Sequence, residues 1–210
     1  MSKLIRVDVF SDIACPFCFI GDTRLTRVFK ARPDLELEWV WHPFQLQPTM
    51  PERGMAWEIF STQKFGGLEA RRAAFATVIQ AGQNEGISFD FETMPVAPNT
   101  ASAHRLVLFA SEFGLGKPMA LALYKAYFSQ AQDITDNLVL EQIAVQVGLD
   151  PSFVRAMLYG ARFRQEVQDS QLEAQRLGIS GVPFFIFNQR LALSGAQPSE
   201  VFEEVLSSLG

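Results

Sequence analysis

The sequence is poor in cysteine, with two residues in a chain of 210. A chain of this length can bury a sufficient hydrophobic core without disulfide cross-links. Apolar residues make up 48% of it and charged residues 20%, which is a globular composition. The length lies between one large and two small domains, so we expect one domain with a subdomain inserted into it.

Positive charge and long apolar runs are also scarce. The net charge of -5 disfavours nucleic acid and anionic membrane surfaces as partners. The longer apolar runs, such as residues 106–110 and 182–187, fall far short of the roughly 18 residues that cross a bilayer. The first residues lead directly into an apolar strand pattern rather than a secretory leader. We therefore expect a cytoplasmic protein without nucleic-acid or membrane partners.

The two cysteines, Cys15 and Cys18, stand three residues apart after a predicted strand at residues 4–10. Pro16 suits the first turn of a helix, where a missing N–H is tolerated. Apolar positions then recur at near-helical spacing until a proline stops the helix, and residues 35–44 predict a second strand. Such a strand–helix–strand unit indicates two parallel strands.

This placement has a chemical consequence for the cysteines. At a helix N-terminus, the Cys15 sulfur faces backbone N–H groups and the positive end of the helix dipole, which favour the thiolate. Cys15 is therefore the predicted nucleophile. Cys18 lies one turn further along, so it is the predicted resolving thiol that attacks a mixed disulfide at Cys15.

A zinc site is the alternative interpretation of two closely spaced cysteines. The chain offers only His42 and His104 as further nitrogen ligands, in unrelated segments without the short spacing of a zinc finger. We therefore predict no metal site. His42, near the end of the second predicted strand, is interpreted as a packed or hydrogen-bonded structural residue.

A second motif lies far downstream, where a glycine-rich turn at residues 178–181 leads to Val182 and Pro183. Proline at the first residue of a strand removes little sheet stability, and the peptide bond before a proline adopts the cis form more readily than other peptide bonds. A cis bond would expose backbone groups with which an extended substrate could pair. A strand at residues 184–187, a hairpin, and a final helix at about residues 198–209 follow.

The middle of the chain, residues 52–178, is predicted to be helical throughout, with glycine or proline at most breaks. Roughly six or seven helices fit by typical helix length. Asn99 is interpreted as a helix cap or a residue of the thiol face, and His104 as a structural hydrogen-bonding residue or a residue of that face. Five aromatic residues are expected in the core rather than at a substrate site: Phe109, Phe113, Tyr124, Tyr127 and Phe128.

These motifs resemble the DsbA family of the thioredoxin superfamily, and in particular its FrnE-like branch of polyketide-biosynthesis dithiol-disulfide isomerases. The similarity runs almost end to end. The motifs that carry it are Ser11-Asp12 with Cys15-Pro16 and Cys18, Pro43-Phe44-Gln45-Leu46 with Pro48, Pro98-Asn99-Thr100, Ala103-His104-Arg105-Leu106, Ala126-Tyr127-Phe128, Asp133-Ile134, Gly181-Val182-Pro183-Phe184-Phe185 and Ser194-Gly195-Ala196-Gln197.

The resemblance implies an α/β fold: a thioredoxin-like mixed sheet (residues 1–51 and 179–210) with a large all-helical subdomain (residues 52–178) inserted between the second and third strands. It implies Cys15 and Cys18 as the catalytic pair and Val182-Pro183 as a cis-proline loop facing them. Substrate-binding residues by the same resemblance are Pro16, Phe17, Asn99 and His104. Unlike secreted DsbA proteins, this chain has no histidine between its cysteines, so we expect a milder oxidant.

The expected function is thiol–disulfide exchange with a protein or small-molecule disulfide. Because the cytosolic glutathione pool is reducing, we expect reductase or isomerase action there, with glutathione or a thioredoxin system as reductant. No cofactor beyond the redox-active pair is needed, although glutathione is a candidate co-substrate. Two alternatives remain: a glutathione-dependent isomerase or transferase related to 2-hydroxychromene-2-carboxylate isomerase, and a chaperone-like module without enzymatic activity.

Overall fold

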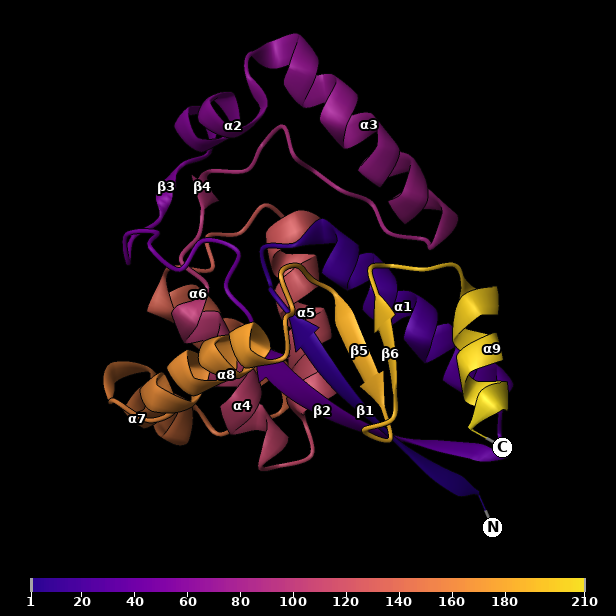
Figure 1. Ribbon diagram of the computed structural model, residues 1–210. Coiled ribbons are helices and arrows are strands. Elements are labelled where there is room, and N and C mark those ends of the chain that lie inside the picture. Colours follow the sequence, from indigo (N-terminus) through magenta and orange to yellow (C-terminus); the bar gives the residue numbers. More distant parts are fainter. Residues whose placement is uncertain (1, 210) are drawn as a thin grey trace.

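The computed structural model describes residues 2–209, and its main sheet has the strand order β2-β1-β5-β6. The first strand, β1 (Lys3–Ser11), pairs in parallel with β2 (Leu35–Pro43). On its other side β1 pairs antiparallel with β5 (Phe184–Phe187), which pairs antiparallel with β6 (Leu191–Ser194). The sheet is therefore mixed, as predicted, and joins the two ends of the sequence (Figure 1).

One face of this sheet is covered by α1 (Pro16–Ala31) and α9 (Ser199–Ser208). The α1 helix connects the parallel strands, which confirms the predicted strand–helix–strand unit. The Phe202 ring of α9 packs edge-on against the ring of Phe185, with 5.1 Å between centroids. Because these rings come from opposite ends of a short hairpin-and-helix segment, they anchor the C-terminus to the sheet.

Seven helices lie in sequence between β2 and β5, which agrees with the predicted number. Their order and bounds are α2 (Trp57–Phe65), α3 (Leu68–Asn84), α4 (Ala101–Ser111), α5 (Gly116–Phe128), α6 (Asn137–Val147), α7 (Pro151–Tyr159) and α8 (Arg164–Arg176). The start of α7 shows the predicted cap, because the Asp150 carboxylate accepts the Ser152 N–H at 2.8 Å and Pro151 opens the helix.

The prediction that residues 52–178 are helical throughout is wrong in one part. Two short strands, β3 (Met55–Ala56) and β4 (Val96–Ala97), pair antiparallel there. Pro95 and Pro98 flank β4, and a proline disfavours helical geometry in the residue before it. The Pro95 carbonyl also accepts the N–H of Trp57 at 3.2 Å, so the strand segment is tied to the start of α2.

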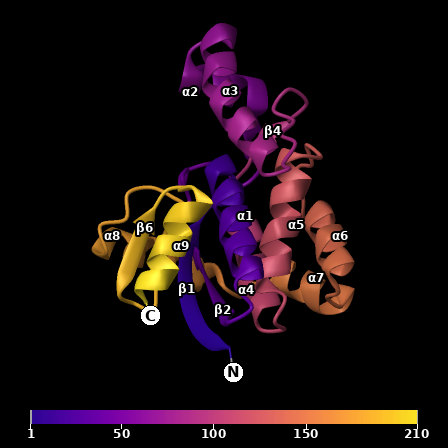
Figure 2. The ribbon, with the colours of Figure 1, turned by 90° about the vertical axis from the view of Figure 1, so that its right-hand side faces the viewer.

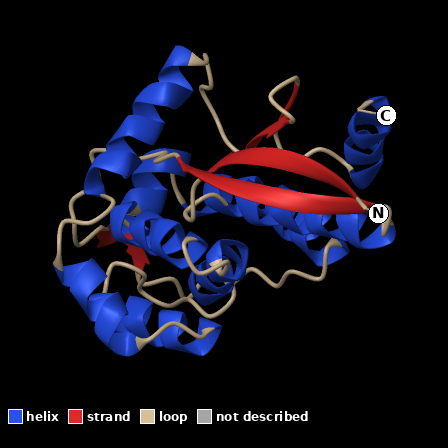
Figure 3. Cartoon of the chain, turned by 90° about the horizontal axis from the view of Figure 1, so that it is seen from below, coloured by secondary structure: helices blue, strands red, loops and turns tan. Residues whose placement is uncertain are grey.

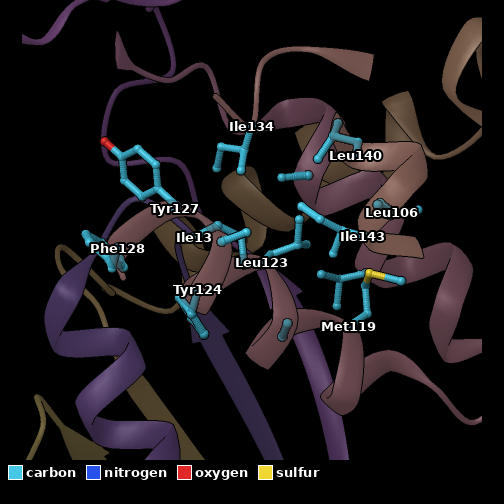
Figure 4. Close-up of a cluster of buried hydrophobic side chains, with 14 of the residues drawn as sticks. Ile13, Leu106, Met119, Leu123, Tyr124, Tyr127, Phe128, Ile134, Leu140 and Ile143 are labelled. Atoms are coloured by element: carbon cyan, nitrogen blue, oxygen red, sulfur yellow. The ribbon is translucent and has the colours of Figure 1, made fainter. Parts of the chain in front are cut away.

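The largest core lies among α4, α5 and α6 (Figure 4). Four of the five aromatic residues predicted for the core are buried, including Tyr124 and Tyr127. Phe113 is the exception, because 52% of it is exposed. It lies two residues beyond the end of α4, off the buried face of that helix, and its ring makes an edge contact with Phe109.

The helices α2 and α3 project beyond the end of the sheet at which α1 begins, as Figures 1 and 2 show. Viewed from below, both termini lie at one side of the molecule and most of the helices at the other (Figure 3). Within residues 2–209, no helix has both the length and the apolar character that a membrane span requires.

Candidate active site

Cys15 is the N-cap residue of α1, and Pro16 is the first residue of that helix. The Cys15 carbonyl accepts the N–H of Cys18 at 3.0 Å, so the first turn holds both cysteines on one short backbone segment. Both are free thiols. Cys15 retains 5% of its surface and Cys18 none, which is the difference in access expected of an attacking and a resolving thiol.

Burial raises the pKa of the Cys18 thiol well above its ordinary value, and the neighbouring Cys15 adds to this increase. A buried sulfur is poorly solvated as an anion, so Cys18 holds its proton more firmly than an exposed thiol would. The arrangement thus separates a slightly exposed thiol, Cys15, from a fully buried thiol that keeps its proton, Cys18.

The peptide bond between Val182 and Pro183 is cis. It lies opposite Cys15, whose sulfur donates to the Val182 carbonyl at 3.5 Å. The structure therefore brings together two motifs that are 167 residues apart in the sequence. A substrate that reaches Cys15 must also meet the backbone of this loop.

Pro16 is half-buried, whereas Phe17 exposes 43% of its surface. Pro16 and Ala14 also line a cavity of about 80 Å³ next to Cys15. Seven aromatic residues contribute to its remaining wall: Trp57, Phe60, Phe65, Phe75, Phe91, Tyr127 and Phe128. The cavity beside Cys15 is therefore rich in aromatic side chains, with Asp12 and Lys64 also in its wall, and no cation lies between the two cysteines in the sequence.

Asn99 holds two backbone segments together. Its carbonyl oxygen accepts the Ala101 N–H at 2.9 Å at the start of α4, and its amide donates to the Met50 carbonyl at 2.7 Å. Thr100 is the N-cap residue of α4, so Asn99 is not the cap itself but binds the first helical N–H from the position before it. Because both polar ends of the side chain are engaged, it serves the local backbone in this conformation.

His104 is fully buried, and its Nε2 lies 3.3 Å from Oδ1 of Asp12, in the turn before Cys15. In this conformation the ring has no exposed surface with which to contact a substrate. The other oxygen of Asp12 accepts the Leu46 N–H at 2.7 Å. His104 therefore lies behind the thiol loop rather than in front of it.

His42 has the structural role predicted for it, remote from the thiols. Its Nε2 lies 2.8 Å from Oδ1 of Asp8, and its ring stacks on Phe10 with 4.5 Å between centroids. Among residues 2–209, no three His, Cys, Asp or Glu side chains form a group that could hold a metal ion.

Sequence reasoning missed a pair of hydroxyl groups beside Cys18. Ser11, the last residue of β1, lies with its Oγ 2.6 Å from the phenol oxygen of Tyr124 on α5. The position of Ser11, at the end of an apolar strand and four residues before Cys15, was a weak sequence signal that it belongs to the site. No local pattern connects it to Tyr124, which is 113 residues away.

A Cys-x-x-Cys pair at a helix start, opposite a cis-proline loop on a mixed sheet, defines the chain as a thioredoxin-fold protein with a dithiol site. More particularly, residues 6–207 match the DSBA-like thioredoxin domain, and the chain belongs to that family. The FrnE-like branch within it stays a prediction.

Solved structures of similar shape include a probable DsbA oxidoreductase, SCO1869, from Streptomyces coelicolor. It is 32% identical, with a TM-score of 0.89 over 97% of this chain and 89% of that one. The fold is also similar to 2-hydroxychromene-2-carboxylate isomerase (13% identity, TM-score 0.76, 97% and 95% covered). A third is the cytosolic disulfide reductase DsbM from Pseudomonas aeruginosa with GSH (20% identity, TM-score 0.67, 97% and 98% covered).

Proposed function

We propose that this protein catalyses thiol–disulfide exchange in the cytoplasm, acting as a reductase or isomerase of a protein or small-molecule disulfide. The observation that carries the proposal is the pairing of Cys15, which keeps 5% of its surface exposed, with a fully buried Cys18 at the start of α1. The Val182 carbonyl, 3.5 Å from the Cys15 sulfur, supplies a backbone acceptor for a bound substrate.

The reaction has two steps. The Cys15 thiolate attacks a substrate disulfide, forming a Cys15–substrate disulfide and releasing one substrate sulfur, which takes up a proton. The Cys18 sulfur then gives up its proton and attacks Cys15, forming the Cys15–Cys18 disulfide, and the second substrate sulfur leaves as a thiol. Two electrons pass from the protein dithiol to the substrate, and a reductant must return them.

A thiol such as glutathione, or a thioredoxin system, is the proposed reductant, because the cytosolic glutathione pool can reduce an oxidising dithiol pair. Support comes from the presence of GSH in the DsbM structure, a protein of the same fold. The apolar residues Pro16 and Phe17 between the cysteines add no cation to stabilise the reduced form. No metal or organic cofactor takes part in either step.

The test is reduction of insulin disulfides with glutathione as electron donor, using wild type, Cys15→Ser and Cys18→Ser. We expect turnover by wild type, none by Cys15→Ser, and accumulation of mixed disulfides by Cys18→Ser, because its resolving thiol is missing. Equal turnover by wild type and Cys15→Ser would refute the proposal. Glutathione-dependent isomerisation that survives in Cys15→Ser would instead indicate the isomerase, and aggregation suppression without turnover would indicate the chaperone-like module.

A further inference from the structure

Cys18 poses a problem for the second step, since a fully buried thiol must ionise before it can attack Cys15. Its surroundings are mostly apolar, and burial opposes ionisation. A hydrogen-bond donor aimed at the Cys18 sulfur would relieve this cost, because hydrogen bonds to charged groups are the stronger ones.

Ser11 is in position to be that donor. Its hydroxyl lowers the pKa of the Cys18 thiol, in opposition to burial, as does the Asp12 backbone. Ser11 itself is buried at the end of β1. Its backbone is held there, because its carbonyl accepts the Phe44 N–H at 3.0 Å.

Tyr124 completes a chain of two hydroxyls. Its phenol oxygen lies 2.6 Å from Ser11 Oγ, and its ring stacks on Phe19 of α1 with 5.3 Å between centroids. Figure 4 shows Tyr124 directed from α5 toward α1. Burial, and then the nearby Cys18, raise the pKa of Tyr124 well above its ordinary value, so the phenol keeps its proton and remains a donor.

The other charged groups near this chain are already engaged elsewhere. Asp22, one turn beyond Cys18 on α1, accepts from Trp39 Nε1 at 2.9 Å and from Lys117 Nζ at 3.2 Å. Asp12 lies against His104 and accepts backbone N–H groups. Of the groups that affect the pKa of Cys18, the Ser11 hydroxyl and the Asp12 backbone are the two that favour its thiolate.

We infer that Tyr124 donates its hydrogen bond to Ser11 and Ser11 donates to Cys18, so that the two hydroxyls stabilise the resolving thiolate. The inference rests on the proposed function, since it concerns the step in which Cys18 releases the substrate. Ser11 touches a reacting sulfur and is a catalytic residue in this sense. Tyr124 acts through Ser11 and is a positioning residue. In this step the Cys18 proton lost is balanced by the proton that the departing substrate thiol gains.

The two steps can be followed separately with 5,5′-dithiobis(2-nitrobenzoate), which releases one coloured thiolate when Cys15 attacks and a second when Cys18 resolves. We expect Ser11→Ala and Tyr124→Phe to leave the first release unchanged and to slow the second at neutral pH. The expected slowing is roughly tenfold to a hundredfold, the effect of losing one hydrogen bond to an ionised group. The difference should shrink as the pH rises, because Cys18 then ionises without help.

Tyr127→Phe is the matched control: it also loses a buried phenol on α5, but one that donates to the Val96 carbonyl at 3.2 Å. It should resolve like wild type, and Ser11→Thr, which keeps a hydroxyl, should restore the second release. The inference is overturned if Tyr124→Phe, which keeps the ring and its stacking, resolves at the wild-type rate, or if Tyr127→Phe is slowed equally. Absence of both releases in wild type would instead refute the proposed function itself.

Discussion

Gly21 occupies the interior of α1, where alanine would ordinarily be the better helix former. A Cβ at this position would lie 3.1 Å from the side chains of both Phe185 and Pro183, closer than the usual 3.5 to 4.0 Å between carbon atoms. Both neighbours are buried and cannot move freely. The absence of a side chain thus lets α1 approach the loop that faces Cys15.

The expected free-energy change for Gly21→Ala follows from two opposing effects. Greater helix propensity stabilises by about 1 kcal/mol, and overpacking a tight core contact destabilises by about 1–3 kcal/mol. The net result is a loss of about 0–2 kcal/mol. Gly21→Val adds two more methyl groups and gains less helix propensity, so we expect a loss of about 3 kcal/mol or more.

The assay is urea unfolding followed by tryptophan fluorescence, with insulin reduction measured on the folded fraction. Because Pro183 adjoins Val182, whose carbonyl faces the Cys15 sulfur, Gly21→Val should also lower the turnover of the folded protein. Gly181→Ala is the stability control, since a Cβ there meets nothing within 4 Å, and it should not destabilise. If Gly21→Val unfolded at the wild-type urea concentration with unchanged turnover, the steric reasoning would be wrong.

Two further predictions concern stability away from the thiols. Burial would raise the pKa of Asp8, but hydrogen bonds with Arg6 and His42 outweigh it and hold that pKa below its ordinary value of 3.8. The Asp8 carboxylate therefore stabilises the fold above that pH, and its contribution is lost as the pH falls through the folded-state pKa. Asp8→Asn should therefore cost about 1–2 kcal/mol at neutral pH, and the difference from wild type should shrink as the pH falls below 3.8 in urea titrations. A constant difference at every pH would contradict this. Arg105 is buried and donates to four backbone carbonyls at the end of α7, of Met157, Leu158, Gly160 and Arg162. Arg105→Lys should cost about 2–4 kcal/mol because an ammonium cannot reach all four carbonyls. Arg155→Lys, in which the arginine side chain is mostly exposed in its pair with Glu141, should cost less than about 1 kcal/mol in the same unfolding assay. Equal losses would show that burial of the Arg105 guanidinium does not matter.

Much of the site could be predicted because its main parts are local in the sequence. Cys15, Pro16 and Cys18 lie within one helical turn, and the strand before them and the proline that stops the helix are short-range signals. The hairpin between β5 and β6 was similarly evident from its turn residues. Such features depend on backbone preferences over a few residues, which the residue types themselves determine.

The middle of the chain was less predictable, for reasons that Phe113 and β4 illustrate. Phe113 is of a residue type that is usually buried, but its exposure depends on where α4 ends relative to the elements packed around that helix. Residues 96–97 form a strand because another short segment is available to pair with them. The secondary-structure and burial preferences of these residues predict neither the exposed Phe113 nor the strand at residues 96–97, because packing partners distant in the sequence decide both.

The sequence alone determined the reactive pair, its position at the start of a helix and the parallel strands around it. The family resemblance already implied that the Val182-Pro183 loop faces this pair. Only the tertiary structure decided the contacts themselves: the Val182 carbonyl 3.5 Å from the Cys15 sulfur, the tight approach at Gly21, and the Ser11–Tyr124 hydroxyl pair near Cys18. These contacts join residues up to 167 positions apart. Short-range backbone preferences cannot specify them, because they arise when the sheet closes and α5 packs against α1.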